Sequence, residues 1–135
     1  MNENQQRRVE VILDALAYLN GAFDDPSSLA YRLKNPALIK SYSLIGKHET
    51  DENGTRVFSS HLAGYKANLY DLERKLTGTT RARITTGDPL STLFSIYGIT
   101  EPAGWKKLIR VVRVALNDES ISEKMTLTSY LDSVV

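Results

Sequence analysis

Residues 31–76, YRLKNPALIKSYSLIGKHETDENGTRVFSSHLAGYKANLYDLERKL, contain the signals that decide the fold of this chain. Asn35-Pro36 predicts a bend, because proline lacks an amide hydrogen and restricts the residue before it. Asn53-Gly54 predicts a tight turn, because both residues tolerate a positive φ. From Ser60 to Leu76, leucine and tyrosine recur at the spacing of one helix face. The stretch therefore predicts a bend, a short β-hairpin or loop near 43–58, and an amphipathic helix.

Apolar residues at helical spacing continue on both sides of this stretch. They predict helices over about 5–20, 89–97, 101–116 and 127–134, and a short helical piece after Pro26. We expect Asp25, Asp88 and Thr100 to cap the helices that follow them, because their side chains can accept hydrogen bonds from free amides of a first helical turn. The sequence thus predicts a mainly α fold, α+β at most, with five or six helices.

Composition excludes several classes of protein. The 135 residues include no cysteine, which rules out disulfides and thiolate zinc sites. The two histidines, His48 and His61, have no clear acidic partner, so we expect no metal and no cofactor. No apolar run approaches the roughly 20 residues of a transmembrane helix, so we expect no membrane insertion. The net charge of +1 conceals a basic middle, since residues 61–113 carry nine Lys or Arg against four Asp or Glu.

Several short motifs occur in an order that composition does not explain. They are Arg32–Lys40 (RLKNPALIK), Val57-Phe58, Gly64–Ala67 (GYKA), Leu93–Gly98 (LFSIYG) and Val114–Leu116 (VAL). In this order they resemble a module of bacteriophage virion proteins related to lytic transglycosylases of the lysozyme-like superfamily. That module reads roughly Arg-Asn-Asn-Asn-Pro-Gly-Asn-Leu-Arg, then Gly-Phe-x-x-Phe and Gly-x-Arg-Ala before a leucine-rich helix. The resemblance covers roughly residues 28–131.

The resemblance implies a compact lysozyme-like domain over 28–131, with an N-terminal helix over 1–21 packed on it as part of one domain, 1–135. It implies a protein made in the host cytoplasm and located in the virion, with other virion subunits as partners and peptidoglycan as a further possible ligand. Two departures from the module are Ala37-Leu38 in place of Gly-Asn, and His61-Leu62 in place of Pro-Glu. Because the acidic residue is missing, we rank a structural or adaptor role first.

The alternative is an enzyme that cleaves peptidoglycan. Such an enzyme needs a carboxylic acid that protonates the glycosidic oxygen. Glu49 is the best candidate, ahead of four other acids, and Arg32 and Asn35 are candidates for substrate binding. The same residues have a simpler interpretation, because acids beside an Asn-Gly turn are ordinarily solvated and Asn35 can cap the bend at Pro36. The other four acids are Asp24, Asp25, Asp51 and Glu52.

A third hypothesis is a DNA-binding helix-turn-helix over residues 88–116. Its second helix carries a basic face that can contact nucleic acid or a partner protein. This face lacks the Asn, Gln, Ser or Thr residues that often join arginine in reading bases, and such a face is more often a solvated surface or a protein interface. The basic residues are Lys106, Lys107, Arg110 and Arg113.

Overall fold

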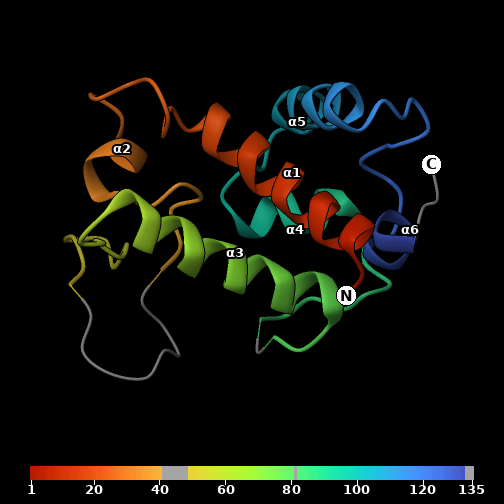
Figure 1. Ribbon diagram of the computed structural model, residues 1–135, viewed down its shortest axis with the longest axis horizontal. Coiled ribbons are helices and arrows are strands. Elements are labelled where there is room, and N and C mark those ends of the chain that lie inside the picture. Colours follow the sequence, from red (N-terminus) through yellow and green to blue (C-terminus); the bar gives the residue numbers. More distant parts are fainter. Residues whose placement is uncertain (41–48, 81, 133–135) are drawn as a thin grey trace.

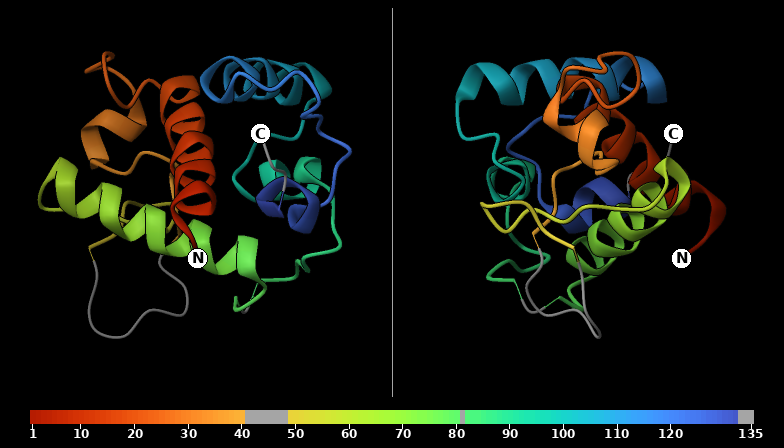
Figure 2. Two further views of the ribbon diagram at one scale, coloured as in Figure 1. Left: turned by 45° about the vertical axis from the view of Figure 1, so that its right-hand side comes forward. Right: turned by 90° about the vertical axis from the view of Figure 1, so that its left-hand side faces the viewer.

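A long central helix, α1 (Glu3–Leu19), organises the computed structural model, which describes residues 1–40, 49–80 and 82–132. Helix α3 (His61–Thr77) packs against one side of α1 and α5 (Pro102–Leu116) against the other, and both run across α1 in the left view of Figure 2 (Figures 1 and 2). The short helix α6 (Leu127–Asp132) contacts both α1 and α3. The fold therefore surrounds α1 with helices that come from distant parts of the sequence.

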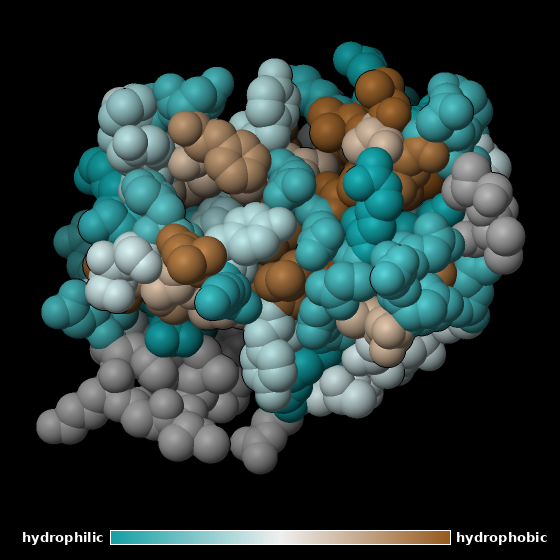
Figure 3. All heavy atoms as spheres, viewed as in Figure 1, coloured by the Kyte–Doolittle hydropathy of each residue, from teal (hydrophilic) through white to brown (hydrophobic). Residues whose placement is uncertain are grey.

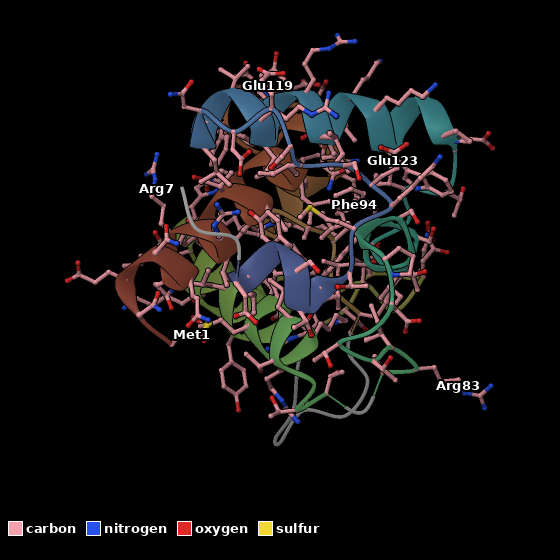
Figure 4. All side chains as sticks on the ribbon, turned by 90° about the vertical axis from the view of Figure 1, so that its right-hand side faces the viewer. Met1, Arg7, Arg83, Phe94, Glu119 and Glu123 are labelled. Atoms are coloured by element: carbon pink, nitrogen blue, oxygen red, sulfur yellow. The ribbon has the colours of Figure 1, made fainter. Side chains whose placement is uncertain are left out.

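Two further short helices complete the set. Helix α2 (Leu29–Leu33) lies beyond the C-terminal end of α1, and α4 (Leu90–Ile96) lies behind α1 in the view of Figure 1. Phe94 points from α4 into the interior, where it is 1% exposed, whereas Arg83 points from the connection before α4 into solvent (Figure 4). The prediction of a mainly α fold with five or six helices is confirmed, since the described residues form six.

Helix α1 has strong local signals as well as a buried face. Asn2 Oδ1 accepts a hydrogen bond from Gln5 N (2.8 Å) while Gln5 Oε1 accepts one from Asn2 N (3.1 Å), a reciprocal capping box. The buried face of α1 joins one hydrophobic core with apolar residues of α3, α4, α5 and α6. Because this core includes the longest helices, most of the free energy of folding comes from packing them together.

A buried arginine ties α1 to α6. The Arg8 side chain is fully buried, donates to Tyr130 O (3.1 Å) and lies 3.6 Å from the Asp118 carboxylate. In return, Tyr130 Oη donates to Arg8 O (2.6 Å). Burying a guanidinium is unfavourable unless it is paired, so these contacts fix how the end of the chain packs on α1.

The predicted helix caps were wrong in three places, and in two of them the aspartate bonds to a neighbouring residue outside the helix. The Asp25 carboxylate accepts from Ser27 N (3.0 Å) and Ser27 Oγ (2.6 Å), and Ser28 caps α2 instead. The Asp88 carboxylate accepts from the upstream Thr85 N (2.8 Å), which leaves Pro89 at the start of α4. Helix α5 begins after Glu101 instead of Thr100, with a proline in its first turn, and no side chain caps it.

The segment around Asn53-Gly54 forms a tight turn between two isolated antiparallel bridges, Lys40 with Thr55 and Thr50 with Arg56. Asp51 holds the turn, because its carboxylate accepts from Asn53 N and Thr55 N, both at 2.9 Å. No longer strand occurs in the described part of the chain, and residues 43–48 of the predicted hairpin lie outside it. The β-hairpin and the lysozyme-like character of the fold stay predictions.

Candidate functional site

Asn35 lies at a buried junction between the bend, the 56–58 segment and α3. Its side chain is fully buried, and its amide nitrogen donates to Ile39 O and Arg56 O, both at 3.0 Å. Its Oδ1 accepts from Ile39 N (3.0 Å) and from Asn68 Nδ2 (2.9 Å). All hydrogen-bonding positions of this amide are therefore used inside the protein. This placement favours the architectural interpretation of Asn35 over substrate binding.

Asn68 on α3 completes the junction. It is also fully buried, accepts from Ala37 N (3.0 Å) and donates to Gly64 O (2.7 Å). A Cβ atom at Gly64 would lie 1.6 Å from Lys34 O and 3.3 Å from a ring carbon of Phe58, so only glycine lets the helix approach the bend this closely. The Asn-Pro bend, Phe58 and α3 thus meet at one place in the structure.

A hollow of about 450 Å³ opens beside this junction, between α2 and the start of α3; we call it the α2–α3 hollow. Its lining includes the paired rings of Tyr31 and His61, whose centroids are 4.9 Å apart. Phe23 and Leu62 stand at its rim with 56% and 62% of their surface exposed. None of the described residues that line it is acidic; they are Ala22, Phe23, Ala30, Tyr31, Lys34, Asn35, Pro36, His61, Leu62 and Tyr65.

Glu49 does not share a hollow with the other predicted site residues. It is exposed, it precedes the Thr50–Arg56 bridge, and its contact there is through its backbone oxygen, which accepts from Val57 N (2.9 Å). Arg32 is exposed at the end of α2, and no described interaction joins it to Glu49 or Asn35. The structure therefore does not gather these three predicted residues into one described site.

A carboxyl that the sequence did not single out lies nearer the α2–α3 hollow. Asp14 on α1 accepts a hydrogen bond from Tyr65 Oη (3.1 Å), and Tyr65 lines the hollow. Asp14 is exposed, yet the loss of solvent on its covered side raises its pKa above the ordinary value. The charge of Glu10 adds to the rise, and the hydrogen bond from Tyr65 opposes it. No motif marks Asp14, because its partner is 51 positions away in the chain.

Helix α5 presents the predicted basic residues in two ways. Lys106, Lys107 and Arg110 are exposed, and we call them the α5 basic face. Arg113 is half-buried and donates through Nε to Ile121 O (2.6 Å), so it supports the connection after α5. Apolar side chains gather over α5 on the face shown in Figure 3, and Val114 on this helix is 75% exposed. Such a mixed surface suits a protein contact better than a phosphate backbone.

A larger hollow, of about 620 Å³, lies between the end of α1 and α5; we call it the α1–α5 hollow. It contains Asp24 and Asp25, which the sequence offered as alternative acids, and two members of the α5 basic face. Its described lining is Ala15, Tyr18, Leu19, Asn20, Gly21, Asp24, Asp25, Lys107, Leu108, Arg110 and Val111.

Comparisons with known proteins returned no match to a family model, to a curated protein or to a solved structure. Within residues 1–40, 49–80 and 82–132, no group of three or more metal-ligating side chains comes together. His48 lies outside those residues. None of the described helices combines the length and the apolar character needed to cross a bilayer.

Proposed function

We propose that this protein is a bacteriophage virion-associated structural or adaptor protein, in the tail, neck or capsid, built on a lysozyme-like module. The observation that carries the proposal is the α2–α3 hollow. It opens beside the Asn35 junction, at the position where the module commonly has Pro-Glu, and this chain places His61 and Leu62 there. A glycosidase needs an acid at its cleft, whereas an apolar hollow without one suits a binding surface.

Three local features support the resemblance on which the proposal rests. The module's asparagine corresponds to Asn35, whose amide is fully used at the junction. Its glycine corresponds to Gly64, where a Cβ would clash with a backbone carbonyl. Its Gly-Asn corresponds to Ala37-Leu38, and Leu38 has a φ of 58°, the left-handed conformation that asparagine adopts more readily than leucine. These three positions thus have geometric requirements that the corresponding residues of the module would meet.

A binding role is supported by the apolar side chains around the hollow. Phe23 and Leu62 are more than half exposed next to the rings of Tyr31 and His61. Aromatic and large apolar residues that share a concave surface are typical anchors of protein interfaces. The α5 basic face is then suited to an acidic neighbouring subunit.

The test is incorporation into particles. Particles purified on a density gradient from a lysate of the encoding phage should contain the chain in constant proportion to the capsid protein. The double variant Phe23→Asp, Leu62→Asp should be depleted from particles, because it charges the rim of the hollow. The control is Tyr70→Asp, which charges a side chain that is 56% exposed and lies outside the α2–α3 hollow. A wild-type chain that stays in the soluble fraction would contradict the proposal.

The second candidate is peptidoglycan cleavage, and the raised pKa of Asp14 beside Tyr65 is the observation that favours it. We expect no clearing in a zymogram of the wild type. Clearing that is lost in Asp14→Asn or in Glu49→Gln would establish the enzyme and name its acid. DNA binding through α5 is the third candidate, and its signature is an affinity for duplex DNA that falls steeply with salt.

A further inference from the structure

The α1–α5 hollow has walls of opposite charge above an apolar floor. Ala15 and Leu108 are buried at its floor, where Leu19 and Val111 are partly exposed. Asp24 and Asp25 approach it from the turn after α1, and Lys107 and Arg110 approach it from α5; all four side chains are exposed. Tyr18 stands at the rim with 64% of its surface exposed. The hollow thus offers contacts of three chemical kinds within one volume.

The charges of the two walls do not neutralise each other directly. In the described part of the chain, ion pairs within 4.0 Å join Arg8 to Asp118 and Lys75 to Asp71, and neither pair lies in this hollow. No described hydrogen bond uses the side chains of Lys107, Arg110 or Asp24. The charged groups on both walls are therefore available to a ligand.

The Asp25 side of the acidic wall is held in place before any ligand binds. Gly21 has a φ of 76°, and its carbonyl accepts from Asp25 N (3.1 Å) and Ser28 Oγ (3.0 Å). The Asp25 carboxylate accepts hydrogen bonds from Ser27 N and Ser27 Oγ, which hold it in place and lower its pKa below the ordinary value. A wall that is already ordered loses little conformational entropy on binding.

The charge pattern selects among ligand classes. A simple anion at Lys107 and Arg110 would face the two aspartates, and a simple cation at the aspartates would face the two basic side chains. A ligand with one charge of each sign and an apolar group between them matches both walls and the floor. A volume of about 620 Å³ is within the usual range of small-ligand sites.

We propose that the α1–α5 hollow binds a short peptide segment in which an apolar side chain lies between a basic and an acidic one. The basic side chain pairs with Asp24 and Asp25, the acidic one with Lys107 and Arg110, and the apolar one packs on Leu19, Leu108 and Val111. Tyr18 covers the segment from the rim, in the manner of tyrosines at protein interfaces. This site is separate from the α2–α3 hollow, and its existence does not depend on a location in the virion.

The probe is the capped tripeptide acetyl-Lys-Leu-Glu-amide, titrated into the full-length protein and followed by the NMR signals of the Leu19, Leu108 and Val111 methyl groups. The analogues with Gln in place of Lys, or of Glu, each remove one charge. We expect the parent peptide to bind about two- to fivefold more tightly than either analogue, the usual value of one exposed ion pair.

Variants locate the two charges. Lys107→Gln should weaken the preference for Glu over Gln in the peptide, because Arg110 remains, and should keep the preference for Lys. Asp24→Asn should weaken the preference for Lys and leave the preference for Glu. The matched control is Lys106→Gln, which removes an exposed neighbour on the same helix that does not line the hollow, and it should change neither preference. The proposal is overturned if the methyl signals do not move, if the analogues bind as tightly as the parent, or if Lys106→Gln acts like Lys107→Gln.

Discussion

The buried Lys75 gives the sharpest test of the packing between α3 and α4. Its side chain is 2% exposed, it pairs with the Asp71 carboxylate one helical turn earlier, and its ammonium lies 4.8 Å from the centre of the Tyr97 ring. Asp71 also accepts a hydrogen bond from Tyr97 Oη (2.7 Å). The substitution Asp71→Asn removes the negative charge and keeps an acceptor for Tyr97, so that Lys75 is left buried without a counter-charge.

Removing one partner of a fully buried ion pair costs about 3–5 kcal/mol of folding free energy. Because Asp71 is 30% exposed, we expect Asp71→Asn to cost less, about 2–3 kcal/mol. Lys75→Met should cost less than Asp71→Asn, because the aspartate that remains is reached by water. The double variant should then be more stable than Asp71→Asn alone.

Urea unfolding followed by far-UV circular dichroism at neutral pH measures all three free energies of unfolding. The control is Lys66→Met, an exposed lysine on the same helix, which should change stability by no more than about 0.5 kcal/mol. A cost below about 1 kcal/mol for Asp71→Asn, or strict additivity of the two substitutions, would refute the claim that this charge pair is coupled.

The other predictions concern the bend, α3 and the end of the chain. Gly64→Ala should cost about 3 kcal/mol in urea unfolding, because its Cβ would lie 1.6 Å from a carbonyl oxygen, while Gly87→Ala should be nearly neutral since its nearest neighbour would be 3.8 Å away. The Leu38→Asn variant should be more stable than Leu38→Ala by about 0.5–1 kcal/mol, because both lose the packing of leucine but asparagine favours the left-handed backbone conformation. A more stable Leu38→Ala variant would contradict the positive φ of this residue. Hydrogen bonds from Ser120, and the charge of Arg8, lower the Asp118 pKa below its ordinary value of 3.8. Ionised Asp118 therefore stabilises the folded state above pH 3.8, and this stabilisation is lost as the pH falls through the pKa of the folded state. The urea midpoint of the Asp118→Asn variant should therefore fall less steeply with decreasing pH than that of the wild type. Equal slopes for the two proteins would show that Asp118 has the same pKa in the folded and the unfolded state.

Helix positions could be predicted from the sequence because their signals are local. Apolar spacing locates α1, α3 and α5 to within a few residues, and Gly78 ends α3 with a φ of 77°, as a left-handed helix end requires. Helix caps were predicted less well, because a short polar side chain has several nearby amides to choose from. Asp25 bonds to Ser27, two residues on, in a turn that competes with the helix start.

The hollows could not be predicted, because they bring together residues that are far apart in the chain. In the α1–α5 hollow, the turn at Asp24 and Asp25 lies opposite side chains of α5, which follow more than 80 positions later in the chain. No periodicity in either segment carries information about the other. The sequence marked both groups of charges, yet it gave no reason to place them at one site.

The fold and the chemistry of the α2–α3 hollow depend on different residues. Asn35 and Gly64 are buried, and substitutions there would disturb the fold. The Asn35 amide makes four hydrogen bonds, and a Cβ atom at Gly64 would clash with the backbone of Lys34. Leu62 is 62% exposed at the rim, and surface substitutions of this kind usually change stability by no more than about 0.5 kcal/mol. An acid at this position is therefore not required for folding. The bend and α3 present whichever side chain stands at the rim, so the chemistry of the hollow can change while the architecture around it is kept.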